Sequence, residues 1–131
     1  MIHVVRENHE ATRLNIQVRE HTFVADMAVT EGGEDAGPDP HDLYDSALGA
    51  CKALTVLWYA KRKGIAVGDV KVTVERDRSH EREGRYQLTT TLTIGGEISE
   101  AQRAELLAVA EKCPVHKLMT QVTTEVLTRL A

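Results

Sequence analysis

The residues best suited to chemistry in this sequence are its only two cysteines, Cys51 and Cys113. Two thiols in one chain can cycle between a dithiol and a disulfide, and a thiolate can attack an electrophile. The first ten residues carry charges and no apolar leader segment, so we expect a cytoplasmic protein without a signal peptide. Structural disulfides are rare in the cytoplasm, which favours a transient, catalytic use of the pair.

Cys113 lies in a setting that favours the thiolate form. It precedes Pro114, a residue that suits the first position of a helix. A thiol beside such a helix start meets the positive end of the helix dipole, and His116 can add a hydrogen bond or a charge. An unperturbed thiol is only about 3% ionised at pH 7, so an attacking sulfur needs such help. A helix end without chemistry is the alternative.

Cys51 is harder to interpret, because it ends the apolar stretch 47–51 and can be a small buried hydrophobic residue. Gly49 inside a helix costs about 1 kcal/mol relative to alanine, which indicates close packing or access to a site. The competing chemistry is a zinc site of Cys51, Cys113 and His116, with His41 as a fourth ligand. The Cys-x-x-His spacing supports it weakly, since structural zinc sites usually show two tight ligand pairs. We therefore expect no metal.

Length and composition predict one globular domain over residues 1–131. Hydrophobic residues make up 42% of the chain and charged residues 27%. The net charge of −4 leaves no excess of cations to neutralise phosphates, so we expect no nucleic-acid partner. No segment reaches the roughly 18 apolar residues of a membrane span, so we expect no membrane partner.

One long helix must carry Cys51. Asp39 is a good N-cap, Pro40 fits the first helical position, and Gly64 suits the position after a helix that ends at about Lys63. Residues 47–60 are nearly all apolar, and a helix that is apolar on every side is buried on every side. A chain of this length has difficulty enclosing such a helix, so we expect a homodimer.

The other elements are predicted from alternation and capping signals. Strands are expected at residues 2–6, 14–18, 23–27, 70–74, 86–94 and 122–128. Ser99 and Gln102 form a capping box that opens a second helix, which ends at about Lys112, and a short helical turn follows at 114–119. Strands and helices occur in blocks, which predicts an α+β fold with an antiparallel sheet.

Two motifs carry a family resemblance. Residues 37–44 (Gly-Pro-Asp-Pro-His-Asp-Leu-Tyr) are followed by 47–51 (Ala-Leu-Gly-Ala-Cys), and Lys-Cys-Pro-Val-His occupies 112–116. Together they resemble the OsmC/Ohr family of osmotically inducible and organic hydroperoxide resistance proteins, and most closely its OsmC-like branch. The resemblance implies antiparallel sheets packed around long central helices in an intertwined homodimer.

The resemblance also implies a reaction. Cys51 would attack a small-molecule peroxide and become a sulfenic acid, and Cys113 would condense with it to a disulfide. A dithiol reductant, such as a lipoylated protein, would restore both thiols without any cofactor. The function predicted in this way is a thiol-dependent peroxidase that reduces organic hydroperoxides to alcohols.

Two departures from the family pattern concern the activation of Cys51. The peroxidases carry a glutamate ten residues before the first cysteine, where this chain has His41, and they use an arginine for which Arg6, Arg13 and Arg19 are candidates here. On a straight helix His41 lies about 15 Å from Cys51, so it acts only through a helix break or across the dimer interface. The departures favour an alternative, a non-catalytic dimer that binds a small apolar or sulfur-containing ligand at its interface. A third possibility is that the cysteines are vestigial.

Overall fold

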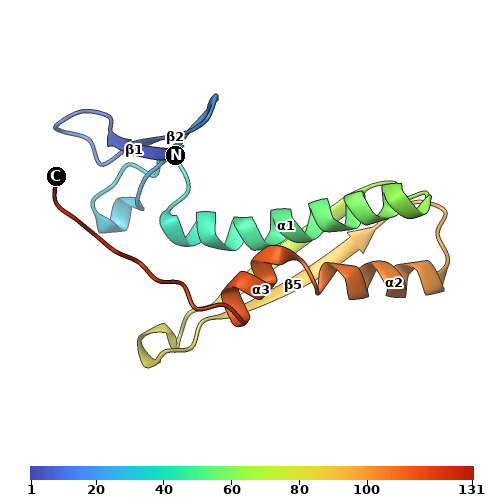
Figure 1. The fold of residues 1–131 in the computed structure, drawn as a ribbon. Coiled ribbons are helices and arrows are strands. Elements are labelled where there is room, and N and C mark those ends of the chain that lie inside the picture. The colour runs from blue at the N-terminus through green and yellow to red at the C-terminus, as the bar shows by residue number, and fades with distance from the viewer. The chain divides into compact units, whose positions relative to one another are not determined.

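The computed structural model describes residues 1–131 and has an α+β architecture with antiparallel sheets, as predicted (Figure 1). The chain forms two compact units, residues 1–44 and 45–131, and each is described by itself. In the first unit, three strands form a sheet in the order β1-β2-β3, and they span Ile2–Arg6, Leu14–Val18 and His21–Ala25. Val4 pairs with Ile16, and Ile16 pairs with Phe23. Short 3-10 helices occupy Val29–Glu31 and, in the second unit, Glu81–Glu83.

A buried carboxylate organises the loop that follows β3. Asp26 accepts hydrogen bonds from the Thr12 hydroxyl at 2.5 Å and from the backbone N–H groups of Met27, Glu34 and Ala36. These hydrogen bonds, that of Thr12 above all, lower the pKa of Asp26 to about 2. The loop is therefore held by a charge that depends on pH.

Helix α1 spans Pro40–Lys63, as the capping residues predict. The backbone N–H of Asp42 donates to the Asp39 carboxylate at 2.8 Å, and the N–H of Asp39 donates to Asp42 at 3.1 Å. This reciprocal pair satisfies N–H groups that a helix start leaves open. Gly64 follows with φ +67°, a left-handed conformation that glycine adopts without strain and that ends the helix.

In the second unit, α1 and α2 pack against a two-stranded sheet. Strands β4 (Val70–Asp77) and β5 (Gln87–Ile94) pair in antiparallel register from Val70–Ile94 to Asp77–Gln87. Helix α2 covers Glu100–Ala110 and begins with the predicted capping box, and α3 covers Pro114–Thr120. The core lies between α1, β5 and α2 and consists of Val56, Ala60, Ile65, Ile94, Leu106 and Ala110.

Gly49 allows α1 to approach the sheet closely. A Cβ atom at this position would lie 2.9 Å from Cγ2 of Val74 on β4. That distance is shorter than two carbon atoms in contact accept, so a larger side chain would push the helix from the strand. The close packing that the glycine indicates in the sequence is confirmed.

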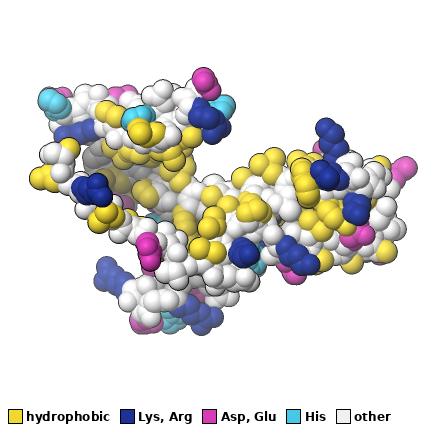
Figure 2. Space-filling view, in the orientation of Figure 1, with side chains coloured by type: hydrophobic (Ala, Val, Ile, Leu, Met, Phe, Trp, Pro, Cys, Tyr) yellow, Lys and Arg dark blue, Asp and Glu magenta, His cyan; other side chains and the backbone are white.

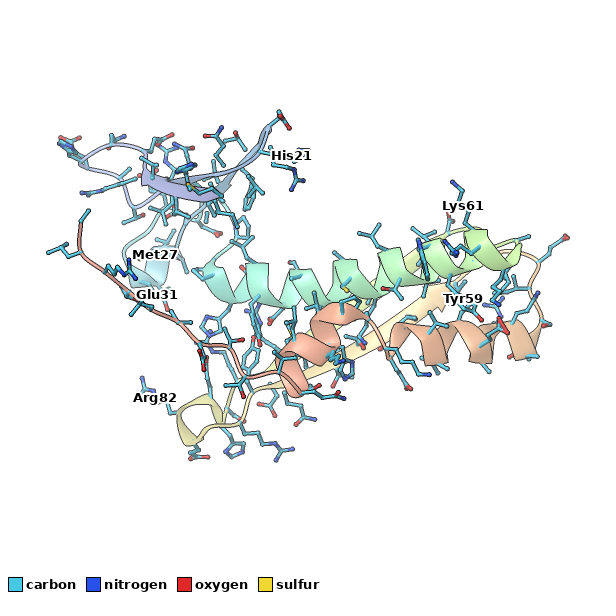
Figure 3. All side chains as sticks on the ribbon, viewed as in Figure 1. His21, Met27, Glu31, Tyr59, Lys61 and Arg82 are labelled. Atoms are coloured by element: carbon cyan, nitrogen blue, oxygen red, sulfur yellow. The ribbon has the colours of Figure 1, made fainter.

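One face of α1 is uncovered in the single chain. Leu54, Leu57 and Trp58 are 65%, 43% and 60% exposed. Figure 2 shows hydrophobic side chains gathered on the visible surface of this helix. Tyr59 lies on the side that faces α2, and Lys61 points away from it (Figure 3). No helix combines the length and the apolar character that a membrane crossing requires.

The strand predicted at 122–128 is not formed, and that prediction is wrong for this chain. Residues 122–131 have no regular secondary structure, and Val126 and Leu127 are 82% and 76% exposed. Alternation describes which face a strand would bury, but a strand also needs a neighbour that accepts its backbone hydrogen bonds. A smaller correction concerns β3, which starts at His21 because the turn falls at Arg19, whose φ is +54°.

Candidate functional site

Cys113 caps the start of helix α3. This residue is the N-cap, Pro114 is the first helical residue, and Cys113 Sγ accepts a hydrogen bond from the His116 backbone N–H at 3.4 Å. The N–H of Cys113 donates to the carbonyl of Ala110, so the end of α2 leads directly into the start of α3. The helix start that Pro114 predicts is confirmed, and it positions the sulfur at the end of α3 where backbone N–H groups point outward.

Cys51 of α1 meets the same end of α3. Its Sγ accepts a hydrogen bond from the Val115 backbone N–H at 3.4 Å, one residue before the N–H that binds Cys113. Both cysteines are free, and the Cys51 thiol lies close enough to Cys113 to raise the pKa of Cys113. The structure therefore brings together two thiols that lie 62 positions apart in the sequence.

The two thiols differ in access. Cys113 is completely buried, whereas Cys51 is half-buried. Burial raises the pKa of Cys113, and the neighbouring Cys51 adds to this, while the His116 N–H and the charge of Lys52 lower it. The net shift is upward. This corrects the expectation that the helix end favours the Cys113 thiolate, because desolvation outweighs the helix end.

A buried lysine adjoins the pair, and sequence reasoning missed it. Lys52 is only 3% exposed, and its Nζ donates to the Ala110 carbonyl at 3.0 Å and lies 2.9 Å from Nδ1 of His116. An ammonium group offers only donors, so with a charged Lys52 the Nδ1 atom accepts and the His116 ring carries its proton on Nε2. Thus His116, a predicted site residue, contacts Cys113 through its backbone N–H and Lys52 through its ring.

A second polar cluster fixes the first half of α1. Asp45 is 5% exposed and accepts hydrogen bonds from the Tyr86 hydroxyl at 2.7 Å and from Arg76 Nε at 2.5 Å. Burial and the Asp45 hydrogen bond raise the pKa of Tyr86 to about 12. This cluster also went unpredicted, although a signal exists in the sequence. Asp45 and Lys52 are seven residues apart, on the stripe of α1 that buries Leu48 and Val56.

The other predicted site residues belong to the first unit. His41 lies in the first turn of α1, and Arg19 is exposed at the turn between β2 and β3. Helix α1 is continuous from Pro40 to Lys63, so no helix break brings His41 to Cys51. The cluster within the second unit thus contains Cys51, Cys113 and His116. The structure holds no group of three or more His, Cys, Asp or Glu side chains that could bind a metal ion.

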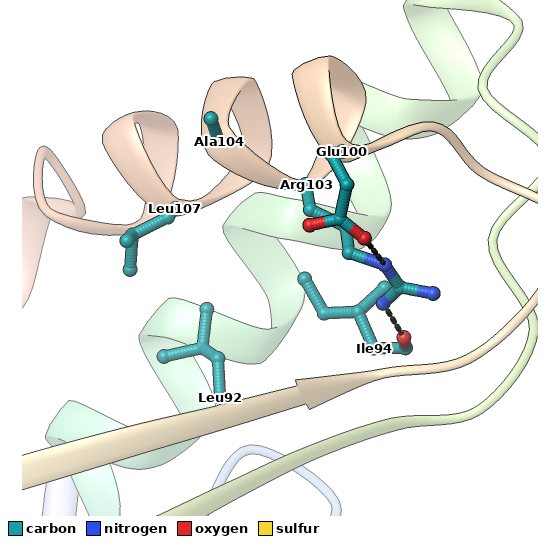
Figure 4. Close-up of a pocket in the computed structure, with 6 residues that line it drawn as sticks. All are labelled: Leu92, Ile94, Glu100, Arg103, Ala104 and Leu107. Atoms are coloured by element: carbon teal, nitrogen blue, oxygen red, sulfur yellow. Dashed lines mark hydrogen bonds and ion pairs between the residues drawn. The ribbon is translucent and has the colours of Figure 1, made fainter.

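Two of the hollows of the molecule lie in the second unit. One, of about 320 Å³, is bounded by polar side chains of the α2–α3 junction and of α3, with His116 among them. The other, also of about 320 Å³, lies between β5 and the first half of α2 (Figure 4). Its apolar walls include Leu92 and Leu107, and at its rim Arg103 binds the Ile94 carbonyl and lies 3.6 Å from Glu100. Only the first hollow adjoins the cysteine cluster.

The long helix α1 carries one cysteine and packs on an antiparallel sheet, and the second cysteine lies beside it at the start of α3. This arrangement defines an α+β protein with a pair of neighbouring cysteines. The family model described as OsmC-like protein matches residues 32–127. The chain belongs to this OsmC-like family, as its two motifs indicate. A search of curated proteins found no match.

Solved structures show the same fold. An OsmC-like protein from Mycoplasma pneumoniae is 22% identical with a TM-score of 0.74, over 93% of this chain and 87% of that one. An organic hydroperoxide resistance protein OsmC from Legionella pneumophila is 20% identical with a TM-score of 0.65, over 92% and 88%. The organic hydroperoxide resistance protein OhrB of Bacillus subtilis is 20% identical with a TM-score of 0.59, over 92% and 90%. The OsmC-like fold predicted from the motifs is confirmed.

Proposed function

We propose that this protein is a thiol-dependent peroxidase that reduces organic hydroperoxides to alcohols. One observation carries the proposal. Two free thiols share the start of α3, and the outer one, Cys51, is accessible while the inner one, Cys113, is buried. An oxidant reaches Cys51 first, and Cys113 lies where it can attack the oxidised sulfur. Membership of the OsmC-like family and the names of two similar structures support the same chemistry.

The reaction has three steps. The Cys51 thiolate attacks the distal oxygen of the hydroperoxide, the O–O bond breaks, and the alkoxide takes a proton and leaves as the alcohol. Cys51 is then a sulfenic acid, and attack by the Cys113 sulfur forms the disulfide and releases water. A dithiol reductant, such as a lipoylated protein, exchanges with this disulfide, is oxidised in turn, and restores both thiols.

Apolar side chains beside Cys51 favour an alkyl hydroperoxide over hydrogen peroxide. Leu54 and Trp58 follow Cys51 by three and seven residues, on the same face of α1, and both are exposed. Leu48 is only 6% exposed and belongs to the buried stripe of α1, so it offers no surface to a substrate. An alkyl group can bury area against Leu54 and Trp58, whereas hydrogen peroxide has no apolar surface to bury.

The proposal includes a homodimer formed by one OsmC-like domain per chain, in the cytoplasm, where thiols are kept reduced. A second copy would pack against the exposed residues Leu54, Leu57 and Trp58 of α1, so the alkyl group would bind beside Leu54 and Trp58 at the interface between the two copies. Across such an interface His41 and Arg19 would be the groups that activate Cys51 or bind substrate. Light scattering tests the dimer, since Trp58→Lys should shift the wild-type mass to that of a monomer.

The peroxidase is tested with tert-butyl hydroperoxide and a dithiol reductant. Wild-type protein should consume the hydroperoxide catalytically, and Cys51→Ser should not. Cys113→Ser should still be oxidised once at Cys51, to a sulfenic acid that a dimedone probe traps, without forming the disulfide. Hydroperoxide turnover by Cys51→Ser at the wild-type rate would refute the proposal.

A second candidate function is a non-catalytic dimer that binds a small apolar or sulfur-containing ligand. The raised pKa of Cys113 favours this alternative, because it keeps that sulfur in the less reactive thiol form. A titration of both thiols against pH separates the two functions. A Cys51 thiolate that forms only under alkaline conditions would favour binding, and a thiolate present at neutral pH would favour the peroxidase.

A further inference from the structure

Lys52 carries an ammonium group that is buried, where a charge has an unfavourable desolvation free energy. Its side chain is 3% exposed, and the two groups that Nζ contacts, the Ala110 carbonyl and the His116 ring, carry no negative charge to offset it. A buried ammonium without an anion is expensive unless an anion forms nearby during function. The arrangement suggests that such an anion appears close to Nζ.

The Cys113 thiol is a neighbouring group that can become such an anion, and the charge of Lys52 acts on it. The Ala110 carbonyl accepts hydrogen bonds both from Lys52 Nζ at 3.0 Å and from the Cys113 backbone N–H at 3.3 Å, so the ammonium lies beside Cys113. His116 connects the same two residues, because its N–H binds Cys113 Sγ and its ring binds Lys52. Lys52 thus contacts groups that hold Cys113 from both α2 and α3.

We propose that Lys52 is a positioning residue whose charge stabilises the Cys113 thiolate when Cys113 resolves oxidised Cys51. The inference rests on the proposed peroxidase function and adds the origin of the resolving thiolate. Cys113 loses a proton, and its sulfur attacks the sulfenic sulfur of Cys51. The S–S bond forms as the S–O bond breaks, and the departing hydroxide takes a proton to become water. The Cys51 sulfur is reduced and the Cys113 sulfur is oxidised.

The groups around Cys113 come from three helices. From α1 they are Lys52, which favours the thiolate, and Cys51, which disfavours it, and from α3 the backbone N–H of His116 favours the thiolate. From α2 the neighbour is the uncharged Ala110 carbonyl. Burial opposes ionisation of Cys113, so a thiolate there needs a compensating positive charge. Lys52 supplies the one full positive charge among these groups. The charge acts again in the reductive half, where Cys113 leaves as a thiolate.

The experiment measures the resolving step alone, at a series of pH values. Cys51 is oxidised with one equivalent of tert-butyl hydroperoxide, and disulfide formation is followed by acid quenching and mass spectrometry. Lys52→Met should slow disulfide formation about tenfold at pH 7, and the rate should recover at alkaline pH as Cys113 ionises unaided. Lys52→Gln, which keeps a donor without the charge, should behave like Lys52→Met, and Lys52→Arg should retain most of the wild-type rate.

Lys112→Met is the matched control, because it removes an exposed positive charge next to Cys113 in the sequence. It should leave the rate and the pH profile unchanged. A loss in Lys52→Met that alkaline pH does not recover, or a wild-type rate in Lys52→Gln, would overturn the inference and leave the peroxidase proposal intact. If Lys52→Met does not fold, the profile of Lys52→Gln decides the question.

A second assay separates failure of the inference from failure of the proposed function. Dithiobis(nitrobenzoate) converts the accessible Cys51 into a mixed disulfide, and attack by Cys113 then releases a second coloured thionitrobenzoate thiolate as the Cys51–Cys113 disulfide forms. This step needs no peroxide. If Cys51 forms no sulfenic acid, the peroxidase proposal fails, yet slower release in Lys52→Met than in wild type would still support the inference. Equal release in both would overturn it.

Discussion

Removing one partner of the ion pair between Asp45 and Arg76 should strongly destabilise the second unit. The Asp45 side chain is 7% exposed and that of Arg76 is 28% exposed, and their atoms Oδ2 and Nε are 2.5 Å apart. The Tyr86 hydroxyl is also hydrogen-bonded to the Asp45 carboxylate. The pair joins α1 to β4 six residues before Cys51, so it holds the helix that carries the accessible thiol.

Replacing Arg76 by methionine leaves a buried carboxylate with Tyr86 as its remaining partner in the cluster. Breaking a fully buried pair in this way costs about 3–5 kcal/mol, and breaking an exposed pair costs about 0–1 kcal/mol. Because Arg76 is partly exposed, water screens the pair, and we expect Arg76→Met to cost about 2–3 kcal/mol. For a chain of this length that lowers the Tm by about 10 °C. Asp45→Asn keeps the shape and the Tyr86 contact and should cost about 1 kcal/mol.

The assay is a double-mutant cycle in urea, followed by circular dichroism at pH 7. Arg76→Met combined with Asp45→Asn should be less destabilised than the sum of the two single variants, with a coupling energy of about 1 kcal/mol or more. Arg78→Met is the matched control, since Arg78 is 51% exposed and pairs with Glu81 at the surface. It should cost less than about 0.5 kcal/mol. A coupling energy indistinguishable from zero, or equal costs for Arg76→Met and Arg78→Met, would refute the reasoning.

Three further predictions concern packing and pH. Gly49→Ala should lower the Tm measured by thermal unfolding, even though alanine favours helices, because the new Cβ would meet Val74. Adding Val74→Ala to the same chain should restore the Tm. The folded-state pKa of Asp26 is about 2, below its ordinary value of 3.8. The stabilising effect of this carboxylate is therefore complete above pH 3.8 and is lost as the pH falls through 2. Urea unfolding of Asp26→Asn should lack this acid-dependent loss of stability. The contribution of Tyr86 to stability depends on pH in the opposite direction, because its pKa is raised from 10.0 to about 12. This contribution is complete below pH 10 and is lost as the pH rises through 12, and Tyr86→Phe should show no such alkaline loss in urea unfolding.

The helices of this protein could be predicted because their ends carry local signals. Asp39 and Pro40 start α1, Gly64 ends it, and the Ser99–Gln102 capping box starts α2. Each signal acts within one or two helical turns, so its effect on the helix end depends little on the surrounding fold. The paired strands were predicted for the same kind of reason, because their alternation matches one buried and one solvated face.

The failed strand at 122–128 shows where local signals end. Its alternation is as regular as that of β5, but β5 has β4 as a hydrogen-bonding neighbour and the last residues of the chain have none within it. Strand pairing depends on which other strand the fold positions beside the segment, and the periodicity of the segment contains no information about that neighbour. A second copy of the chain is one source of such a neighbour, and this adds a reason to measure the mass of the protein in solution.

Three of the predicted site residues, Cys51, Cys113 and His116, lie together in the structure, but their electrostatics could not be predicted. Pro114 correctly indicated that Cys113 starts a helix, yet the thiolate expected there is opposed by burial, a property of the packed molecule rather than of the helix end. Lys52 interrupts the otherwise apolar residues 47–60, and it lies seven residues after Asp45 on the buried stripe. Two charges of opposite sign on the buried face of one helix are too costly to be incidental, because each must find its own partner. Asp45 is paired with Arg76, whereas Lys52 contacts only the neutral Ala110 carbonyl and the His116 ring, which is the reason for proposing that the charge of Lys52 acts on the Cys113 thiol.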